Sequence, residues 1–160
     1  MESIDISEVV ISNNDWTIET ILDQLVRKNI QIEPNSPRRD VWNLVTKSRF
    51  IESIILGLPI SQIVLAAYGR ERWKYIVVDG NQRLLSLLEF YGRSETENNS
   101  FSLTGLDFRT ELNGCNYQSI EKNISINSVL TNLDNQTIRV VRIQNWSDES
   151  LLDNIYSRLN

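Results

Sequence analysis

The stretch from Val77 to Arg93, VVDGNQRLLSLLEFYGR, constrains the fold more than any other part of the chain. An apolar run of β type ends at Asp79-Gly80, and a helical pattern of leucines opens at Asn81. This order predicts a strand, a tight glycine turn and a helix. Such a turn directs free backbone N–H groups and the positive end of a helix dipole at one point, where an anion can bind.

The side chains of this turn allow a functional and a structural interpretation. Arg83 is a fixed cation with a planar fork of donors and suits phosphate. Asp79 could hold a metal, a ribose hydroxyl or Arg83 itself, and Gln82 could orient a water molecule or cap the helix. In the structural alternative, Asp79 caps the helix beside a solvated Arg83, or the two form a salt bridge that fixes the turn. Gly80 suits every case, because close backbone approach and positive φ both favour glycine.

Length and composition limit the classes of protein. A chain of 160 residues, 41% of them apolar, fits one compact domain with an ordinary core. With no 18-residue apolar stretch and no signal-type leader, we expect no membrane span and a cytoplasmic location. The chain has no histidine, which excludes HNH-type nuclease sites, Ser-His-Asp triads and His/Cys zinc sites within it. We therefore expect that this chain alone does not cut DNA.

Charge is distributed unevenly along the chain. Residues 1–26 carry six acidic and no basic residues, residues 27–93 carry eleven basic against six acidic, and residues 94–160 carry five basic against nine acidic, for a net charge of −5. The basic central block contains the glycine turn. This pattern favours a nucleotide or a short nucleic-acid contact over an extended DNA footprint, for which the domain would be basic overall. A random mixture of solvated charges is the alternative.

Apolar periodicity predicts a mixture of helices and strands. We expect helices at 18–26 (capped by Asp15 or Thr17), at 40–56 (capped by Asp40), at 81–91, 117–122 and 127–133, and from Ser147 or Asp148 to the end. We expect strands at 30–33, 62–68, 73–79 and 137–143, a hairpin turn at 69–72, and a short strand and turn within 101–114. Residues 1–14 are expected to form a loose polar segment or an added edge. The fold class is therefore α/β (α+β), a small mixed sheet with packed helices.

Four blocks of the sequence resemble a known family. Residues 79–83 (DGNQR) are similar to the Asp-Gly-Gln-Gln-Arg signature of the N-terminal domain of GmrSD-type, modification-dependent restriction endonucleases, in the ParB/sulfiredoxin-like group of nucleotide-binding domains. The other blocks follow in the family's order: 34–42 (PNSPRRDVW), 50–60 (FIESIILGLPI) and 154–160 (NIYSRLN). Asn81 departs from the family's usual Gln, and Pro37 stands where Gln is usual before Arg38, which removes an amide side chain and a backbone donor.

The resemblance implies a fold, an activity and a set of partners. It implies one ParB/sulfiredoxin-like domain over residues 15–160, truncated after Asn160, because the family's chain continues into a helical region and often a nuclease domain. It implies NTP binding, with hydrolysis, that regulates a restriction or phage-defence nuclease outside this chain and contacts DNA through a larger complex. The expected cofactor is Mg²⁺ with a nucleoside triphosphate. The alternative is a non-catalytic module that senses modified DNA or mediates assembly and retains the motif.

The resemblance also assigns site residues. Asp79 and Gln82 are the expected catalytic residues, and Asp79 the expected metal ligand. The expected nucleotide- and phosphate-binding residues are Gly80, Asn81, Arg83, Arg38, Arg158 and Asn160. Arg39 could take the place of Arg38. Trp42 is expected to pack in the core rather than stack on a base.

Overall fold

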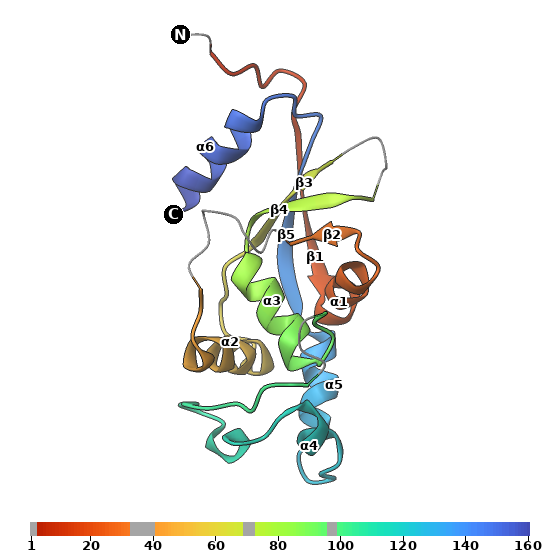
Figure 1. Cartoon of the computed structure of the whole chain (residues 1–160), viewed down its shortest axis with the longest axis vertical. Coiled ribbons are helices and arrows are strands. Elements are labelled where there is room, and N and C mark those ends of the chain that lie inside the picture. The colour runs from red at the N-terminus through yellow and green to blue at the C-terminus, as the bar shows by residue number, and fades with distance from the viewer. Residues whose placement is uncertain (1–2, 33–40, 69–72, 96–98) are drawn as a thin grey trace.

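The computed structural model describes residues 3–32, 41–68, 73–95 and 99–160, and within these residues its centre is a five-stranded sheet (Figure 1). The strands, in the spatial order β1-β5-β3-β4-β2, are β1 (Val10–Thr17), β5 (Thr137–Gln144), β3 (Ile63–Ala67), β4 (Tyr75–Asp79) and β2 (Ile30–Gln31). The pairs β1–β5 and β3–β4 are antiparallel, whereas β3–β5 and β2–β4 are parallel. The predicted α/β class with a small mixed sheet is confirmed.

Helices occur where apolar periodicity predicts them, with shifted ends. They are α1 (Ile18–Val26), α2 (Leu44–Leu56), α3 (Asn81–Phe90), α4 (Tyr117–Glu121), α5 (Ser128–Asn135) and α6 (Glu149–Leu159). Thr17 caps α1 and Asp148 caps α6, each one of the two predicted candidates. Asn43 caps α2, while the predicted cap Asp40 and the predicted turn 69–72 lie outside the described residues. Within the described part of the chain, no helix has the length and apolarity needed to cross a membrane.

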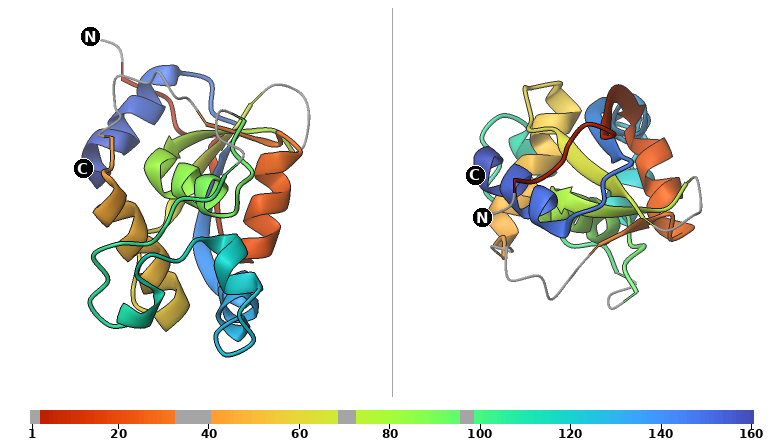
Figure 2. Two further views of the ribbon diagram at one scale, coloured as in Figure 1. Left: turned by 60° about the horizontal axis from the view of Figure 1, so that its bottom comes forward. Right: turned by 90° about the horizontal axis from the view of Figure 1, so that it is seen from above.

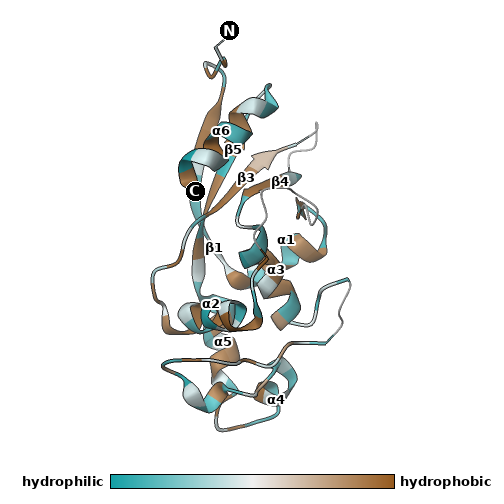
Figure 3. Cartoon of the chain, turned by 60° about the vertical axis from the view of Figure 1, so that its left-hand side comes forward, coloured by the Kyte–Doolittle hydropathy of each residue, from teal (hydrophilic) through white to brown (hydrophobic). Residues whose placement is uncertain are grey.

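The two faces of the sheet bury two separate apolar clusters. Strand residues alternate between faces, so Ile63 and Leu65 join the larger cluster with α1, α2, α3 and α5. Val64 and Ala66 join the smaller cluster, which is closed by Leu152 of α6. The central strands β3 and β4 are accordingly hydrophobic along most of their length (Figure 3). Figures 1 and 2 show α6 at the opposite end of the molecule from α4 and α5.

The N-terminal segment contributes the edge strand of the sheet. β1 pairs with β5 in unbroken register from Val10 to Thr17. Of the two predictions for residues 1–14, an added edge is therefore correct for residues 10–14. The strand then leads without a loop into α1, because the Thr17 hydroxyl accepts a hydrogen bond from the N–H of Thr20.

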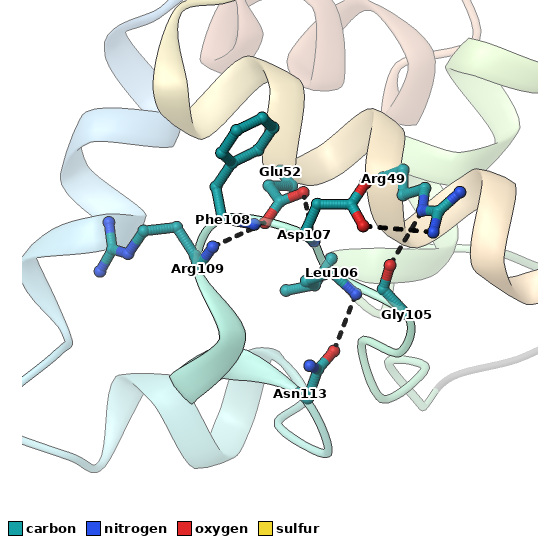
Figure 4. A network of polar contacts seen from close by, with 8 residues as sticks. All are labelled: Arg49, Glu52, Gly105, Leu106, Asp107, Phe108, Arg109 and Asn113. Carbon is teal, nitrogen blue, oxygen red and sulfur yellow. Dashed lines mark hydrogen bonds and ion pairs between the residues drawn. The ribbon is translucent and has the colours of Figure 1, made fainter.

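A buried acid of α2 holds the segment after α3 (Figure 4). Glu52 is only 3% exposed, and its carboxylate accepts hydrogen bonds from the N–H groups of Asp107, Phe108 and Arg109 at 3.2, 2.9 and 2.7 Å. The short strand predicted within 101–114 is wrong, since this segment forms a loop and one turn of 3₁₀ helix (η1, Thr110–Leu112). The backbone donors of residues 107–109 are satisfied by Glu52 of α2, and that of Leu106 by the Asn113 side chain, so these donors need no strand partner.

Candidate functional site

The predicted strand, glycine turn and helix are all present. β4 ends at Asp79, Gly80 has a φ of +117°, and α3 begins at Asn81. A Cβ atom on Gly80 would lie 2.6 Å from Cδ1 of Ile63 on the neighbouring strand β3. Both the backbone conformation and the close approach of β3 therefore require glycine here.

The N-terminus of α3 has no side-chain cap. Gly80 is its N-cap residue, whereas α1, α2, α4 and α6 each begin with a side chain that accepts a backbone hydrogen bond. The structural alternative in which Asp79 caps the helix is therefore wrong. Uncapped N–H groups at the positive end of a ten-residue helix can bind an anionic group.

Arg83 is an anchored side chain. Its Nη2 donates to the carbonyl of Gln62 at 2.9 Å and to Oδ2 of Asp79 at 3.3 Å. The side chains of Arg83 and Asp79 are only 14% and 18% exposed, so the alternative of a solvated arginine is wrong. The salt bridge that fixes the turn is present, and it uses only one of the guanidinium nitrogens.

The end of α6 also reaches this turn. Nδ2 of Asn160 lies 3.5 Å from Oδ1 of Asp79 and donates to the carbonyl of Tyr156 at 3.0 Å. Asn160 therefore joins Asp79 and Arg83, although more than seventy residues separate them in sequence. Arg158 does not take part in these contacts. It is exposed on α6, and its Nε donates within the helix to Asn154 at 2.7 Å.

Gln82 connects the turn to the segment before α2. It is 7% exposed, and its Oε1 accepts a hydrogen bond from the N–H of Trp42 at 3.0 Å. The Trp42 ring packs edge-on against Phe50 with centroids 5.6 Å apart, which confirms the expected packing role. Arg38 and Arg39 lie outside the described residues. The described chain resumes at residue 41, directly before the residue that Gln82 holds.

Three consecutive residues of the turn have buried polar atoms without partners. They are Oδ1 of Asn81, Nε2 of Gln82 and Nε of Arg83. In the described part of the chain only two other buried side-chain atoms are unpaired, Oγ of Ser12 and Nε of Arg142. Buried polar groups in folded proteins are normally paired, so a concentration of one acceptor and two donors distinguishes this turn from the rest of the described residues.

The site offers one carboxylate to a metal. Among the described residues no group of three or more His, Cys, Asp or Glu side chains could hold a metal ion. Protein sites for Mg²⁺ often use one or two carboxylates together with phosphate oxygens of the substrate. Asp79 therefore fits Mg²⁺ that arrives with a triphosphate, and it does not form a protein-only metal site.

Comparison with known proteins decides the family. The family model described as "GmrSD restriction endonuclease, N-terminal domain" matches residues 18–160. The chain belongs to this family. No curated protein and no solved structure matches it. Membership confirms the predicted family and implies a role in a restriction or phage-defence system, while the correspondence of residues 79–83 to the family's signature stays a prediction. The finer assignment of the GmrSD N-terminal domain to the ParB/sulfiredoxin-like group stays a prediction.

Two features of the GmrSD-type turn were not predicted from the sequence. Gln62 anchors Arg83 through a main-chain carbonyl, and Ile63 excludes any side chain at position 80. Neither contact depends on a recognisable side-chain pattern. The burial of Glu52, by contrast, could be predicted from the sequence, because Glu52 is the one acid within the apolar run FIESIILGLPI. A lone acid on an apolar helix face is typical of a buried, hydrogen-bonded carboxylate.

Proposed function

We propose that this chain is the nucleotide-binding, NTP-hydrolysing regulatory domain of a DNA restriction system, with its site at residues 79–83. The observation that carries the proposal is the set of unpaired buried atoms on Asn81, Gln82 and Arg83 at the uncapped N-terminus of α3. A triphosphate supplies an acceptor for Nε of Arg83, the attacking water accepts from Nε2 of Gln82, and a ribose hydroxyl or a second water supplies a donor for the Asn81 oxygen.

Each site residue has a distinct role in this proposal. The N–H groups at the start of α3 and the free Nε of Arg83 bind phosphate oxygens, and Arg38 and Arg158 supply further positive charge. Asp79 accepts from Arg83 and Asn160, and its carboxylate would hold Mg²⁺ brought in with the triphosphate. Such an ion would supply positive charge where negative charge develops on the leaving phosphate. The free amide of Gln82 orients the attacking water.

The partners follow from the family and from composition. A GmrSD-type domain without histidine provides regulation, and DNA cleavage belongs to a nuclease domain or subunit outside this chain. An extended DNA footprint belongs to that larger complex, because the chain carries a net charge of −5. Nucleotide binding would then control when the complex acts.

One observation favours a second candidate function. The Asp79–Arg83 salt bridge and the Gln62 contact tie β3, β4 and α3 together without a nucleotide. A non-catalytic module for modified DNA or for assembly would keep the motif for this structural reason alone. This alternative predicts no nucleotide binding by the folded chain.

Titration calorimetry with GTP, ATP and CTP, with and without Mg²⁺, separates the two candidates. We expect one triphosphate to bind, and Arg83→Lys to weaken binding about tenfold, because a point charge replaces a planar fork. Arg139→Lys is the matched control, since Arg139 pairs with Asp15 at 3.6 Å on the exposed sheet edge. Absence of binding for all three nucleotides by a folded wild type would favour the non-catalytic module.

A further inference from the structure

A pocket lies at the other end of β4 from Asp79. Its volume is about 580 Å³, within the size range of small-molecule sites. One wall comes from the end of β1 and one face of α1, and the other from the residues that lead into β4. Tyr75 begins β4 and Asp79 ends it, so the two sites are roughly 13 Å apart along the strand.

Three of the nine residues that line this pocket are aromatic. Trp16, Trp73 and Tyr75 line it, and Trp73 is 63% exposed. The two remaining tryptophans of the chain have structural partners: Trp42 packs on Phe50, and Trp146 donates from Nε1 to the carbonyl of Ala67 at 2.6 Å. An exposed indole beside a concave surface gives a flat apolar ligand a face to stack on.

The pocket also carries a surplus of positive charge. Arg27 is balanced by Asp23 at 3.0 Å, but Lys74 forms no ion pair with any residue that the structure describes. Behind the aromatic wall, the guanidinium of Arg142 lies 5.9 Å from the centre of the Trp16 ring and 3.3 Å from the Tyr75 hydroxyl. An anionic group on the ligand is therefore favoured although the whole chain is acidic.

Two amides supply donors and acceptors for the edge of a ring. Gln24 and Asn29 both line the pocket, and Nδ2 of Asn29 donates to Oε1 of Gln24 at 3.0 Å. This bond fixes the two amides relative to each other, and the Gln24 amino group and the Asn29 side-chain oxygen have no other partner among the residues that the structure describes. Together they form a donor and an acceptor of the kind that reads the hydrogen-bonding edge of a base.

We propose that this pocket binds an unstacked nucleobase that carries a phosphate. The base stacks on Trp73 and Trp16, its edge bonds to Gln24 and Asn29, and Lys74 contacts the phosphate. This site differs from the triphosphate site proposed at residues 79–83, because it lies at the opposite end of β4 and because α1, the helix that begins beside it, is capped by the Thr17 side chain. Its ligand is either a base of a single strand of DNA or a free nucleotide.

The test measures binding of a fluorescein-labelled 12-nucleotide single strand of DNA by anisotropy, with competition by deoxynucleoside monophosphates. Trp73→Ala should weaken binding about tenfold or more, the usual effect of removing one stacking ring. Phe108→Ala is the matched control, because Phe108 is 66% exposed and lies on the Glu52 loop away from the pocket. Lys74→Gln should reduce the dependence of affinity on salt.

The outcomes show whether the pocket binds a base and whether that base belongs to a DNA strand or to a free nucleotide. Binding of the strand without competition by monophosphates indicates DNA, and equal binding of monophosphates indicates a free nucleotide. The proposal is overturned if neither ligand binds, or if Trp73→Ala binds as tightly as Phe108→Ala. Because Trp73 lines this pocket and is not part of the site at residues 79–83, the effect of Trp73→Ala distinguishes failure of this proposal from failure of the proposed triphosphate site.

Discussion

Nη2 of Arg83 lies 3.3 Å from the carboxylate of Asp79, and the same nitrogen donates to the carbonyl of Gln62, the residue directly before β3. One nitrogen thus connects the end of β4, the first turn of α3 and the start of β3. Since both side chains are mostly buried, loss of either charge leaves the other without its partner. The turn is therefore structurally coupled to the proposed nucleotide site.

Removal of Arg83 should affect stability as well as binding. We expect Arg83→Ala to lower the free energy of unfolding by about 1–3 kcal/mol, because Asp79 and the Gln62 carbonyl lose a charged donor. Urea denaturation of the single variants Arg83→Ala and Asp79→Ala and of the double variant measures the coupling. If the free energy of unfolding lost by the double variant equals the sum of the losses of the two single variants, a direct interaction between Arg83 and Asp79 is contradicted.

Substitution of Gly80 tests the close approach of β3. Gly80→Ala should destabilise the chain by about 1 kcal/mol or more beyond Gly114→Ala, because a methyl group must displace the Ile63 side chain. Both glycines have positive φ, at +117° and +83°, but a Cβ at Gly114 meets no atom within 4 Å. Chemical denaturation of the two variants therefore isolates the loss of stability that is caused by the clash of the added methyl group with Ile63. Equal losses would show that only backbone strain matters at Gly80.

Local patterns were sufficient to predict the centre of the fold. The strand, the turn and the helix around Asp79-Gly80 were all predicted, because the residues that determine them are adjacent in the sequence. The predicted strand within 101–114 failed for a non-local reason. Glu52 of α2 satisfies the backbone there, and sequence spacing does not report which distant carboxylate meets which N–H group.

The candidate site was predictable where its residues are contiguous. Asp79 and Arg83 are one helical turn apart, so their proximity followed from the motif. The contact of Asn160 with Asp79 depends on how α6 packs against β4, and only the resemblance to GmrSD-type sequences indicated that Asn160 belongs to the site. Arg158 came from the same sequence block, yet it lies on the exposed surface of α6.

Glu52 should be a stability residue without a role in binding. Glu52→Gln is expected to cost about 1–3 kcal/mol, because one amide oxygen replaces two carboxylate oxygens that accept three backbone donors. Glu121→Gln on the exposed surface of α4 is the control. Thermal unfolding of both variants checks the prediction, and a Glu52→Gln midpoint equal to that of Glu121→Gln would contradict it.

Tyr91 should make stability fall at high pH. Burial and the hydrogen bond to Asp134, 2.6 Å long, raise the pKa of the Tyr91 hydroxyl well above its ordinary value of about 10. The unfolded chain therefore releases this proton first, so the stabilisation is complete below about pH 10 and is lost as pH rises further. Between pH 8 and 10.5, urea midpoints should fall more steeply for wild type than for Tyr91→Phe. If the urea midpoint falls with pH equally steeply for wild type and for Tyr91→Phe, the attribution of this pH dependence to Tyr91 is contradicted.

Amide NMR of the ¹⁵N-labelled chain during titration with GTP, ATP or CTP and Mg²⁺ tests the proposed nucleotide site most directly. Backbone amides respond to a nearby phosphate, and the N–H groups of Gly80, Asn81, Gln82 and Arg83 lie at the uncapped start of α3. We predict that one triphosphate shifts these amides first and most, while the amides of the distant helix α4 stay unchanged. No shift at residues 80–83 with any triphosphate, or shifts confined to another part of the chain, would contradict the account.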